Sequence, residues 1–227
     1  MIVSVHQPQY LPWLGYFDKI DRADVFVLLD TVQYKKNEWQ NRNRIKTAQG
    51  AQWLTVPVTY RFPQLICEVG VNGCERWQHR QRQALVTNYR RAPHWESLEG
   101  FFGDLFSRGW ESVAALNIHV VKRLAAILGI TTPIHVASGL GPLPEEPDER
   151  LIALTKRFGA GTYLAGSGGH DYMDLSKYER AGIEVVFQDY RHPRYDQLFG
   201  EFESHLSVID LIYNHGEASL PILRGLS

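Results

Sequence analysis

The sequence predicts an α/β fold in which a mostly parallel central sheet carries helices on both faces. Short β-branched apolar runs alternate with stretches of helical periodicity, and the runs are apolar throughout, as in strands buried on both faces of a parallel sheet. Right-handed crossovers arrange such units in three layers. The 227 residues suffice for one core and contain no linker or internal repeat, so we expect a single domain over residues 1–227.

The first 22 residues have the layout of a strand, a ligand loop and a helix. The apolar run at residues 1–5 breaks into a loop with two prolines, and LGYFDKID follows with helix-like spacing. Ligands of parallel sheets bind beyond the carboxyl ends of the strands, close to helix N-termini. We therefore expect ligand contacts from five side chains: His6, Gln7, Tyr10, Trp13 and Tyr16. In the alternative interpretation, Pro8 and Pro12 only stiffen the connection, and the core is filled by Trp13, Leu14 and Phe17.

A basic segment follows the second strand, VFVLLD, whose last residue, Asp30, points to the same edge of the sheet. Residues 33–46 hold five basic side chains against the single carboxylate of Glu38. Cations mixed with amides and aromatic rings suit a phosphate or a nucleotide, although a basic run is often only a solvated loop. The predicted binding residues of this segment are Gln33, Lys35, Lys36, Trp39, Asn41 and Arg42.

A small β insertion and a helical block separate the two halves of the sheet. Residues 53–58 and 66–71 predict two short strands that form a hairpin, with Pro57 placing the first at an edge or bulge. Residues from about 75 to 130 predict helices that cover one face of the sheet, the last ending at Gly129. The histidines of this block lack metal-ligand spacing, so we predict no metal site.

The strand and helix rhythm then returns. A strand at residues 133–138 precedes a helix at 145–160 with an acidic first turn, and a strand at 162–165 runs into GSGGHDYMD. The glycines of this turn allow close backbone approach and an anion-binding nest, although glycine-rich turns are also common without a ligand. The predicted site residues of the turn are Ser167, Gly168, His170 and Tyr172.

The last predicted strand, at residues 182–190, brings Asp189 to the ligand edge, and His192 follows it. The final helix begins at Ser207 with Asp210 three residues later, a spacing like that of a capping box with Asp in place of Glu. The start of this helix is therefore predicted to be structural.

Composition narrows the range of partners. A net charge of −1 and a pI near 6.8 provide no general attraction to nucleic acid or anionic lipid. The sequence has no apolar run of the roughly 18 residues that span a bilayer, so no membrane insertion is expected. The two cysteines, Cys67 and Cys74, do not form a CxxC pattern, and we expect no signal peptide. Both features suit a reducing cytoplasm. The oligomeric state is open.

Five blocks of the sequence, in order, resemble the WbqC-like protein family along essentially the whole chain: HQPQYLPWLGYFDKI, LLDTVQYKKNEWQNRNRI, the Trp-x-x-His-Arg helix, YLAGSGGHDYMD and LSVIDLIYNHG. The resemblance implies a role in bacterial O-antigen or other polysaccharide biosynthesis, with glycine transfer as one proposed reaction. The matching positions are His6, Gln7, Pro8, Tyr10, Trp13, Gly15, Asp30, Gln33, Trp39, Asn41, Arg42, Gly166, Tyr172, Asp210 and Asn214.

The opening unit is also similar to the start of nucleotidylyltransferase-type folds and of pantoate–β-alanine ligase. Those proteins use an H-x-G-H element to stabilise phosphate during adenylyl transfer. Here Trp13-Leu14-Gly15-Tyr16 stands where both histidines would be. This departure argues against adenylyl transfer by that element.

Together these features give the hypothesis of an acyl transferase that acts on the amine of a nucleotide-linked sugar, with glycyl as a candidate for the acyl group. In this scheme His6 or His170 removes the proton of the amine, and Asp30 or Asp189 orients that base or the amine. The basic segment and the glycine-rich turn bind the phosphates. The co-substrate is ATP with Mg²⁺ or an activated acyl donor. The alternatives are a nucleotidylyltransferase with Asp30 as a Mg²⁺ ligand and a non-catalytic subunit that binds a sugar nucleotide.

Overall fold

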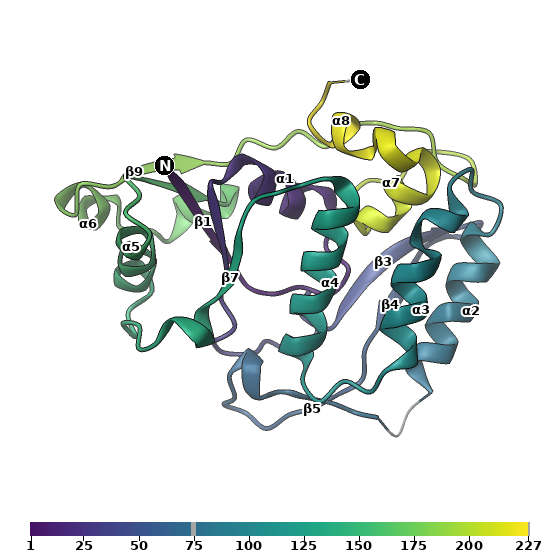
Figure 1. The fold of residues 1–227 in the computed structure, drawn as a ribbon, viewed down its shortest axis with the longest axis horizontal. Coiled ribbons are helices and arrows are strands. Elements are labelled where there is room, and N and C mark those ends of the chain that lie inside the picture. The colour runs from purple at the N-terminus through teal and green to yellow at the C-terminus, as the bar shows by residue number, and fades with distance from the viewer. Residues whose placement is uncertain (74–75, 227) are drawn as a thin grey trace.

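The centre of the protein is a five-stranded, all-parallel sheet (Figure 1). The computed structural model describes residues 1–73 and 76–226, so Cys74 lies outside the described residues. The strands, in their order across the sheet, are β7 (Ile134–Val136), β2 (Val25–Leu28), β1 (Ile2–His6), β8 (Thr162–Ala165) and β9 (Glu184–Phe187). The predicted parallel α/β sheet is confirmed.

Helices cover both faces of this sheet, as predicted. Val25 and Val27 of β2 pack into one apolar cluster, and Phe26 and Leu28 pack into another, because successive side chains of a strand point to opposite faces. The first cluster includes residues of α5 (Pro147–Arg157) and α6 (Leu175–Arg180). The larger cluster includes residues of α1 (Leu14–Arg22), α4 (Val113–Leu128), α7 (Val208–His215) and α8 (Ser219–Leu223).

The helical block contains α2 (Trp77–Tyr89), α3 (Glu99–Ser107) and α4, with a short 3-10 turn, η2 (Trp95–Leu98), before α3. Helix α4 begins at Ser112, whose side chain accepts a hydrogen bond of 3.1 Å from the amide of Ala115. It ends at Gly129, which has the left-handed φ of 81° that favours glycine. Helix α4 lies nearest the sheet, while α2 and α3 lie farther out, beside a β-hairpin (Figure 1).

That hairpin differs from the prediction. Part of the basic segment forms a strand, β3 (Arg42–Thr47), which pairs antiparallel with β4 (Gly50–Thr55). The hairpin predicted from residues 53–58 and 66–71 is reduced to β5 (Val58–Thr59) and β6 (Gly70–Val71). Strand β3 lacks an apolar pattern because its buried polar side chains bond to other segments: Asn43 Nδ2, for example, donates to the carbonyl of Leu11 at 2.7 Å.

Three distant segments meet at Ser207. Its amide donates to the carbonyl oxygen of Arg44 in β3 at 2.9 Å, and the next amide, of Val208, donates to the carbonyl oxygen of Pro12 at 2.8 Å. The hydroxyl of Ser207 caps α7 by accepting from the amide of Ile209 at 3.5 Å. The second half of the predicted capping box is wrong, because the carboxylate of Asp210 accepts from Tyr89 and other side chains instead.

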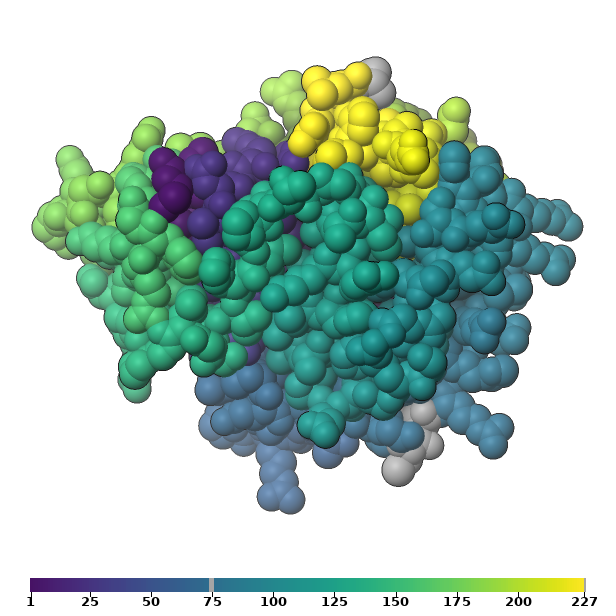
Figure 2. Space-filling model, viewed as in Figure 1, coloured from purple at the N-terminus to yellow at the C-terminus, as the bar shows by residue number. Residues whose placement is uncertain are grey.

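From the side shown in Figure 2, the helical block and the C-terminal helices form one continuous surface. The remaining turns are the 3-10 segments η1 (Ile66–Glu68), η3 (Ala137–Leu140), η4 (Ser167–Asp171) and η5 (Gly216–Ala218). Among the helices of the described ranges, none combines the length and hydrophobicity required to cross a membrane.

Candidate functional site

A cavity of about 790 Å³ opens at the carboxyl edge of the sheet. Numbered along the chain, the sheet has the strand order 3-2-1-4-5, so the direction of the connections reverses between β1 and β8. Ligands of open α/β sheets bind in the crevice at such a reversal. The cavity is lined from β1 by Val5 and His6, from β8 by Tyr163 and Ala165, and by residues that follow β2 and begin α5.

Several predicted site residues meet in this cavity. Its lining includes His6, Gln7, Gln33, Lys35, Gly166 and Tyr172. The opening loop, the basic segment and the glycine-rich turn therefore each contribute to one cavity, although they are far apart in the sequence. Arg42, Ser167 and Gly168 do not line it.

A second, smaller cavity of about 360 Å³ adjoins the first. His6, Gln7 and Lys35 line both, so the two cavities share a wall. The second cavity adds the tryptophans Trp13 and Trp39. An elongated ligand with a charged centre and a ring at one end fits this arrangement.

His6 is neutral in this environment. Its Nδ1 lies 3.1 Å from the carbonyl oxygen of Gln7, and its ring stands edge-on to Tyr16 with 4.8 Å between ring centroids. Burial, followed by the positive charge of Lys19, lowers the pKa of His6 to about 3. An imidazole with so low a pKa is a weak base, so the structure argues against His6 as the proton acceptor.

Lys19 is a functional candidate that the sequence analysis missed. The residue is only 3% exposed, yet it lines the larger cavity, and its Nζ donates to the carbonyl oxygen of Val5 at 3.2 Å. No ion pair joins Nζ to a carboxylate in the part of the chain that the structure describes. Burial lowers the pKa of Lys19 to about 7. A signal was present, since Lys19 follows the sheet-facing Tyr16 by three residues, on the same side of the helix.

The cavity is cationic. Lys19, Lys35 and Arg150 line it, and none of the described residues of its lining is an aspartate or a glutamate. Arg150 donates from Nε to the carbonyl oxygen of Pro144 at 2.9 Å and from Nη2 to that of Glu145 at 2.5 Å. Neutral carbonyls leave the guanidinium charge uncompensated, so the lining suits an anionic ligand.

Asp30 does not face the cavity. It is buried, and its two carboxylate oxygens accept from the amide of Ser138 at 2.9 Å and from the hydroxyl of Ser138 at 2.7 Å. The carboxylate therefore holds η3 at the end of β7, because the free backbone N–H of that turn needs an acceptor. This geometry argues against both predicted roles of Asp30, as an orienting residue and as a Mg²⁺ ligand.

Asp189 is exposed and also lies outside the cavity lining. Its neighbour Gln188 is the buried residue at the end of β9. Gln188 Nε2 donates to the carbonyl oxygen of Gly15 at 2.8 Å and to Oδ2 of Asp18 at 2.6 Å. These bonds fix the edge strand to α1 and are structural.

The glycine-rich turn forms the 3-10 helix η4, and its glycines do not adopt the left-handed backbone of a nest. The predicted nest is therefore wrong: the amide of Gly169 already bonds to the carbonyl oxygen of Gly166 at 2.9 Å. His170 is exposed and stacks on Phe187, with 3.5 Å between ring centroids, outside the cavity lining. Only Gly166, Tyr172 and Met173 of this region line the cavity.

Three predicted binding residues hold the core together instead. The hydroxyl of Tyr10 donates to Gln81 Oε1 at 2.6 Å, and Asn41 Nδ2 donates to the carbonyl oxygen of Val56 at 2.9 Å. The hydroxyl of Tyr16 donates to the carbonyl oxygen of Gln7 at 3.0 Å. Tyr16 therefore supports the cavity wall without lining it.

The remaining predicted residues lie around the smaller cavity or outside it. Trp13 stacks on His205 with 5.2 Å between ring centroids and on His192 with 6.4 Å; His192 itself lines neither cavity. Burial lowers the pKa of His192. Lys36 is exposed and lines neither cavity.

Trp39 belongs to an exposed aromatic and cationic surface on the β3–β4 hairpin. It lies against Trp53 with 5.5 Å between ring centroids, and the two side chains are 38% and 42% exposed. The guanidinium carbon of Arg42 lies 4.3 Å from the centre of the Trp53 ring. Trp39 and Arg42 are predicted site residues, whereas Trp53 is not, because its strand was expected to pair with residues 66–71.

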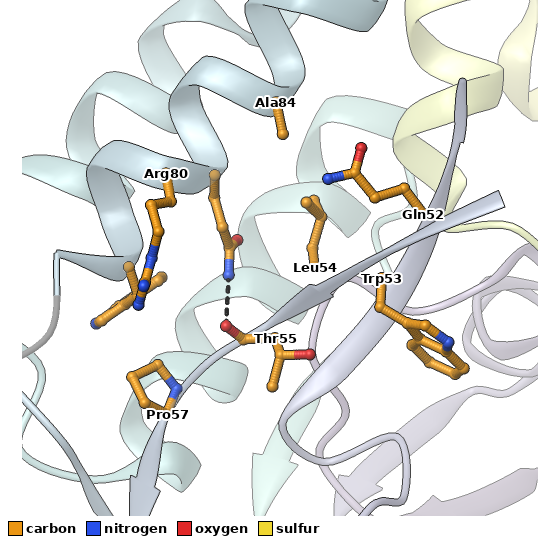
Figure 3. A pocket seen from close by; sticks show the side chains of 9 residues that line it. Gln52, Trp53, Leu54, Thr55, Pro57, Arg80 and Ala84 are labelled. Carbon is orange, nitrogen blue, oxygen red and sulfur yellow. Dashed lines mark hydrogen bonds between the residues drawn. The ribbon is translucent and has the colours of Figure 1, made fainter. Parts of the chain in front are cut away.

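A groove of about 420 Å³ lies between β4 and α2, and Trp53 is also part of its lining (Figure 3). Gln81 Nε2 of α2 donates to the carbonyl oxygen of Thr55 in β4 at 3.0 Å. No predicted site residue lines this groove. It is where the hairpin packs on the helical block.

The fold and the cavity define an α/β protein with a cavity lined by basic side chains at the reversal of a parallel sheet. The chain belongs to the WbqC-like protein family, whose family model matches residues 7–222. It is 35% identical over 226 residues to the uncharacterized protein Rv1507c of Mycobacterium tuberculosis (strain ATCC 25618 / H37Rv), covering 98% of this chain and 97% of that protein. No solved structure matches the chain.

Proposed function

We propose that the protein is a transferase of bacterial O-antigen or polysaccharide biosynthesis that forms an amide, transferring an acyl group to the amine of a nucleotide-linked sugar. Glycyl is the first candidate for the acyl group. Membership of the WbqC-like family supports the pathway. A cytoplasmic location and a free small-molecule substrate are part of the proposal.

The observation that carries the proposal is the charge of the cavity at the strand reversal. Lys19, Lys35 and Arg150 line it without any acidic residue from the described chain. The diphosphate of a sugar nucleotide is the anion that Lys35 and Arg150 would hold, because charge-assisted hydrogen bonds to phosphate are strong and directional. A volume of about 790 Å³ is also within the range of small-molecule sites.

The second cavity supports an elongated ligand. Lys35 stands on the wall shared by the two cavities, where the diphosphate at the centre of a sugar nucleotide would lie. One end of the ligand would then reach Trp13 or Trp39. Since His205 already stacks on Trp13, the partly exposed ring of Trp39 is the one that suits a base or the apolar face of a sugar. The other end would reach the sheet edge beside His6.

The reaction requires an activated acyl donor, either an acyl group activated by ATP with Mg²⁺ or a thioester. The amine must lose a proton before its nitrogen attacks the acyl carbon. General-base assistance contributes about 10²- to 10⁴-fold in rate, so positioning of the diphosphate must supply the rest. Gln7 and Gln33 carry amides into the same cavity and would position the sugar hydroxyls.

The test is a melting-temperature panel with sugar nucleotides, ATP and CoA, because a ligand that binds the folded state raises the melting temperature as its concentration exceeds Kd. We expect sugar nucleotides to stabilise the protein. Incubation of a stabilising amino-sugar nucleotide with glycine, ATP and Mg²⁺, or with acyl thioesters, should then give an amide detected by its mass.

Other outcomes would contradict this function in distinct ways. Pyrophosphate release without an amide product would indicate the nucleotidylyltransferase. Stabilisation without turnover of any donor would indicate the sugar-nucleotide-binding subunit. Absence of stabilisation by any sugar nucleotide would remove the ligand class altogether.

A further inference from the structure

Lys19 is the most buried of the three basic residues that line the larger cavity. Lys19 is 3% exposed, whereas Lys35 is exposed and Arg150 is half-buried, so the three basic side chains differ in burial. Lys35 and Arg150 are placed to hold phosphates near the cavity mouth. The reacting end of a ligand would then be the part that reaches Lys19.

We infer that the Lys19 amine is the general base of this site and takes the proton from the attacking amine of the acceptor sugar. The inference rests on the proposed function and assigns the base within it. It replaces His6 and His170, the two bases that the sequence suggests.

The groups around Lys19 provide no negative charge. On its own helix, Asp18 accepts from Gln188 and pairs with Arg22 at 3.6 Å, and Asp21 pairs with Arg224 at 2.8 Å. Both carboxylates are therefore committed to partners other than Lys19.

The elements packed against Lys19 are equally free of carboxylates that face it. Strand β1 contributes the neutral His6 and the carbonyl of Val5, and β8 contributes the phenol of Tyr163. The rest of the titratable lining is Lys35, Arg150 and Tyr172. Burial raises the pKa of Tyr163, so this phenol does not provide an anion.

A buried ammonium without a counter-ion loses its hydration, which favours the neutral amine. The pKa of Lys19 falls to about 7, where a general base is both largely available and strong enough to accept a proton. The neutral amine donates one hydrogen to Val5 and keeps its lone pair for the cavity. His6, with its pKa near 3, is far weaker.

The step balances as follows. The acceptor ammonium gives one proton to the neutral Lys19 amine and becomes a free amine. Its lone pair forms the new C–N bond at the acyl carbon, and the bond from that carbon to the leaving group breaks. The second nitrogen proton goes to the leaving group, and the Lys19 ammonium releases its proton to water through the cavity mouth. The products are an amide, the protonated leaving group and a proton.

The first experiment needs no substrate. Trace acetylation of the folded, ligand-free protein with acetic anhydride, from pH 5 to pH 11, reads the fraction of neutral Lys19 from the mass of its peptide. We expect a midpoint near pH 7, moving to about 10.5 for the same lysine in denaturant. A midpoint above pH 9 in the folded protein would overturn the inference. Absence of labelling at every pH would also overturn it, because the amine would not be reachable from the cavity.

The second experiment compares Lys19→Met with Lys19→Arg. Arginine keeps a positive charge but cannot accept a proton at neutral pH, so both variants should lose about 10²- to 10⁴-fold in kcat. Sugar-nucleotide affinity should stay within about threefold of wild type in Lys19→Arg. Wild-type kcat in Lys19→Arg would instead make Lys19 an anion-binding residue and end the assignment. Melting temperatures confirm that both variants fold.

The two experiments separate the inference from the proposed function. If the labelling midpoint lies near 7 but no amide forms with any donor, the proposed reaction fails while Lys19 remains a reactive amine. If amide forms and the midpoint lies above 9, the function stands and the base assignment fails.

Discussion

The hydroxyl of Tyr89 donates a hydrogen bond of 2.7 Å to Oδ1 of Asp210 and joins α2 to α7 across 121 residues of sequence. The other carboxylate oxygen accepts from the hydroxyl of Tyr195 at 3.0 Å and from Gln197 Nε2 at 2.8 Å. Asp210 is fully buried, and burial raises the pKa of its carboxyl. Three donors therefore converge on one buried acceptor group.

Asp210→Asn should lower the free energy of unfolding by about 1–3 kcal/mol, because the introduced NH₂ group would face donors and leave them unpaired. Urea denaturation at pH 7 measures this difference. Asp196→Asn is the matched control, since Asp196 is exposed in the same part of the chain. Equal midpoints for wild type and Asp210→Asn would show that the cluster does not depend on the carboxylate.

The pH dependence of stability should differ between wild type and Lys19→Met. Lys19 has a pKa near 7 when folded and 10.5 as its ordinary value, so between these limits the unfolded chain binds more protons. Stability of the wild type should then rise with pH relative to Lys19→Met, by about 1 kcal/mol per unit. Urea unfolding of both proteins at pH 7.5 and pH 9 measures the slope, and buried tyrosines cancel in the comparison. Parallel curves would contradict the low pKa.

Two neighbouring glycines should respond oppositely to alanine. A Cβ on Gly169 would lie 2.7 Å from Met173 Sδ and 2.9 Å from Phe187 Cε1, whereas one on Gly168 would meet nothing within 4 Å. Gly169→Ala should cost about 1–3 kcal/mol through overpacking, and Gly168→Ala should be neutral or slightly stabilising. Met173 lines the larger cavity, so Gly169→Ala should also weaken ligand binding. Denaturation and ligand titration check both effects, and a larger loss in Gly168→Ala would refute this packing.

Lys35→Ala should weaken sugar-nucleotide binding roughly tenfold or more, because Lys35 lines both cavities and charged hydrogen bonds contribute about 1.5–3 kcal/mol. Lys36→Ala is the control, since this adjacent exposed lysine lines neither cavity. Isothermal titration measures both affinities, and melting temperatures should stay unchanged. An equal loss in the two variants would mean that general electrostatic attraction, not a contact at the shared wall, holds the ligand.

Much of the fold could be predicted because its central strands are mostly buried on both sides. Val25–Leu28 is apolar throughout, and the later strands are separated by helices with clear start and stop signals. Strand β3 escaped prediction because its buried polar residues, such as Asn43, bond to loops that are distant in the sequence. The pairing of Arg44 with Trp53 depends on tertiary contacts, so the periodicity of residues along the chain does not predict it.

The sequence predicts some of the residues that line the larger cavity, but not Lys19. The strand ends place His6 and Gly166 at the cavity, since every parallel strand delivers its carboxyl end to the same side. The sequence could not show that both carboxylate oxygens of Asp30 would accept hydrogen bonds from Ser138. Lys19 was missed because a lysine in a short helix is usually solvated, and its burial depends on strands β1 and β8 meeting over it.

The junction at Ser207 also determines when the ligand loop can be completed. During synthesis, Pro12 and Arg44 leave the ribosome long before the residues whose amides satisfy their carbonyls. Contacts of such large sequence separation form late in folding. A truncation that removes the chain from residue 207 onward should therefore leave the opening loop unanchored, and a C-terminal fusion should be designed to keep α7 seated on it.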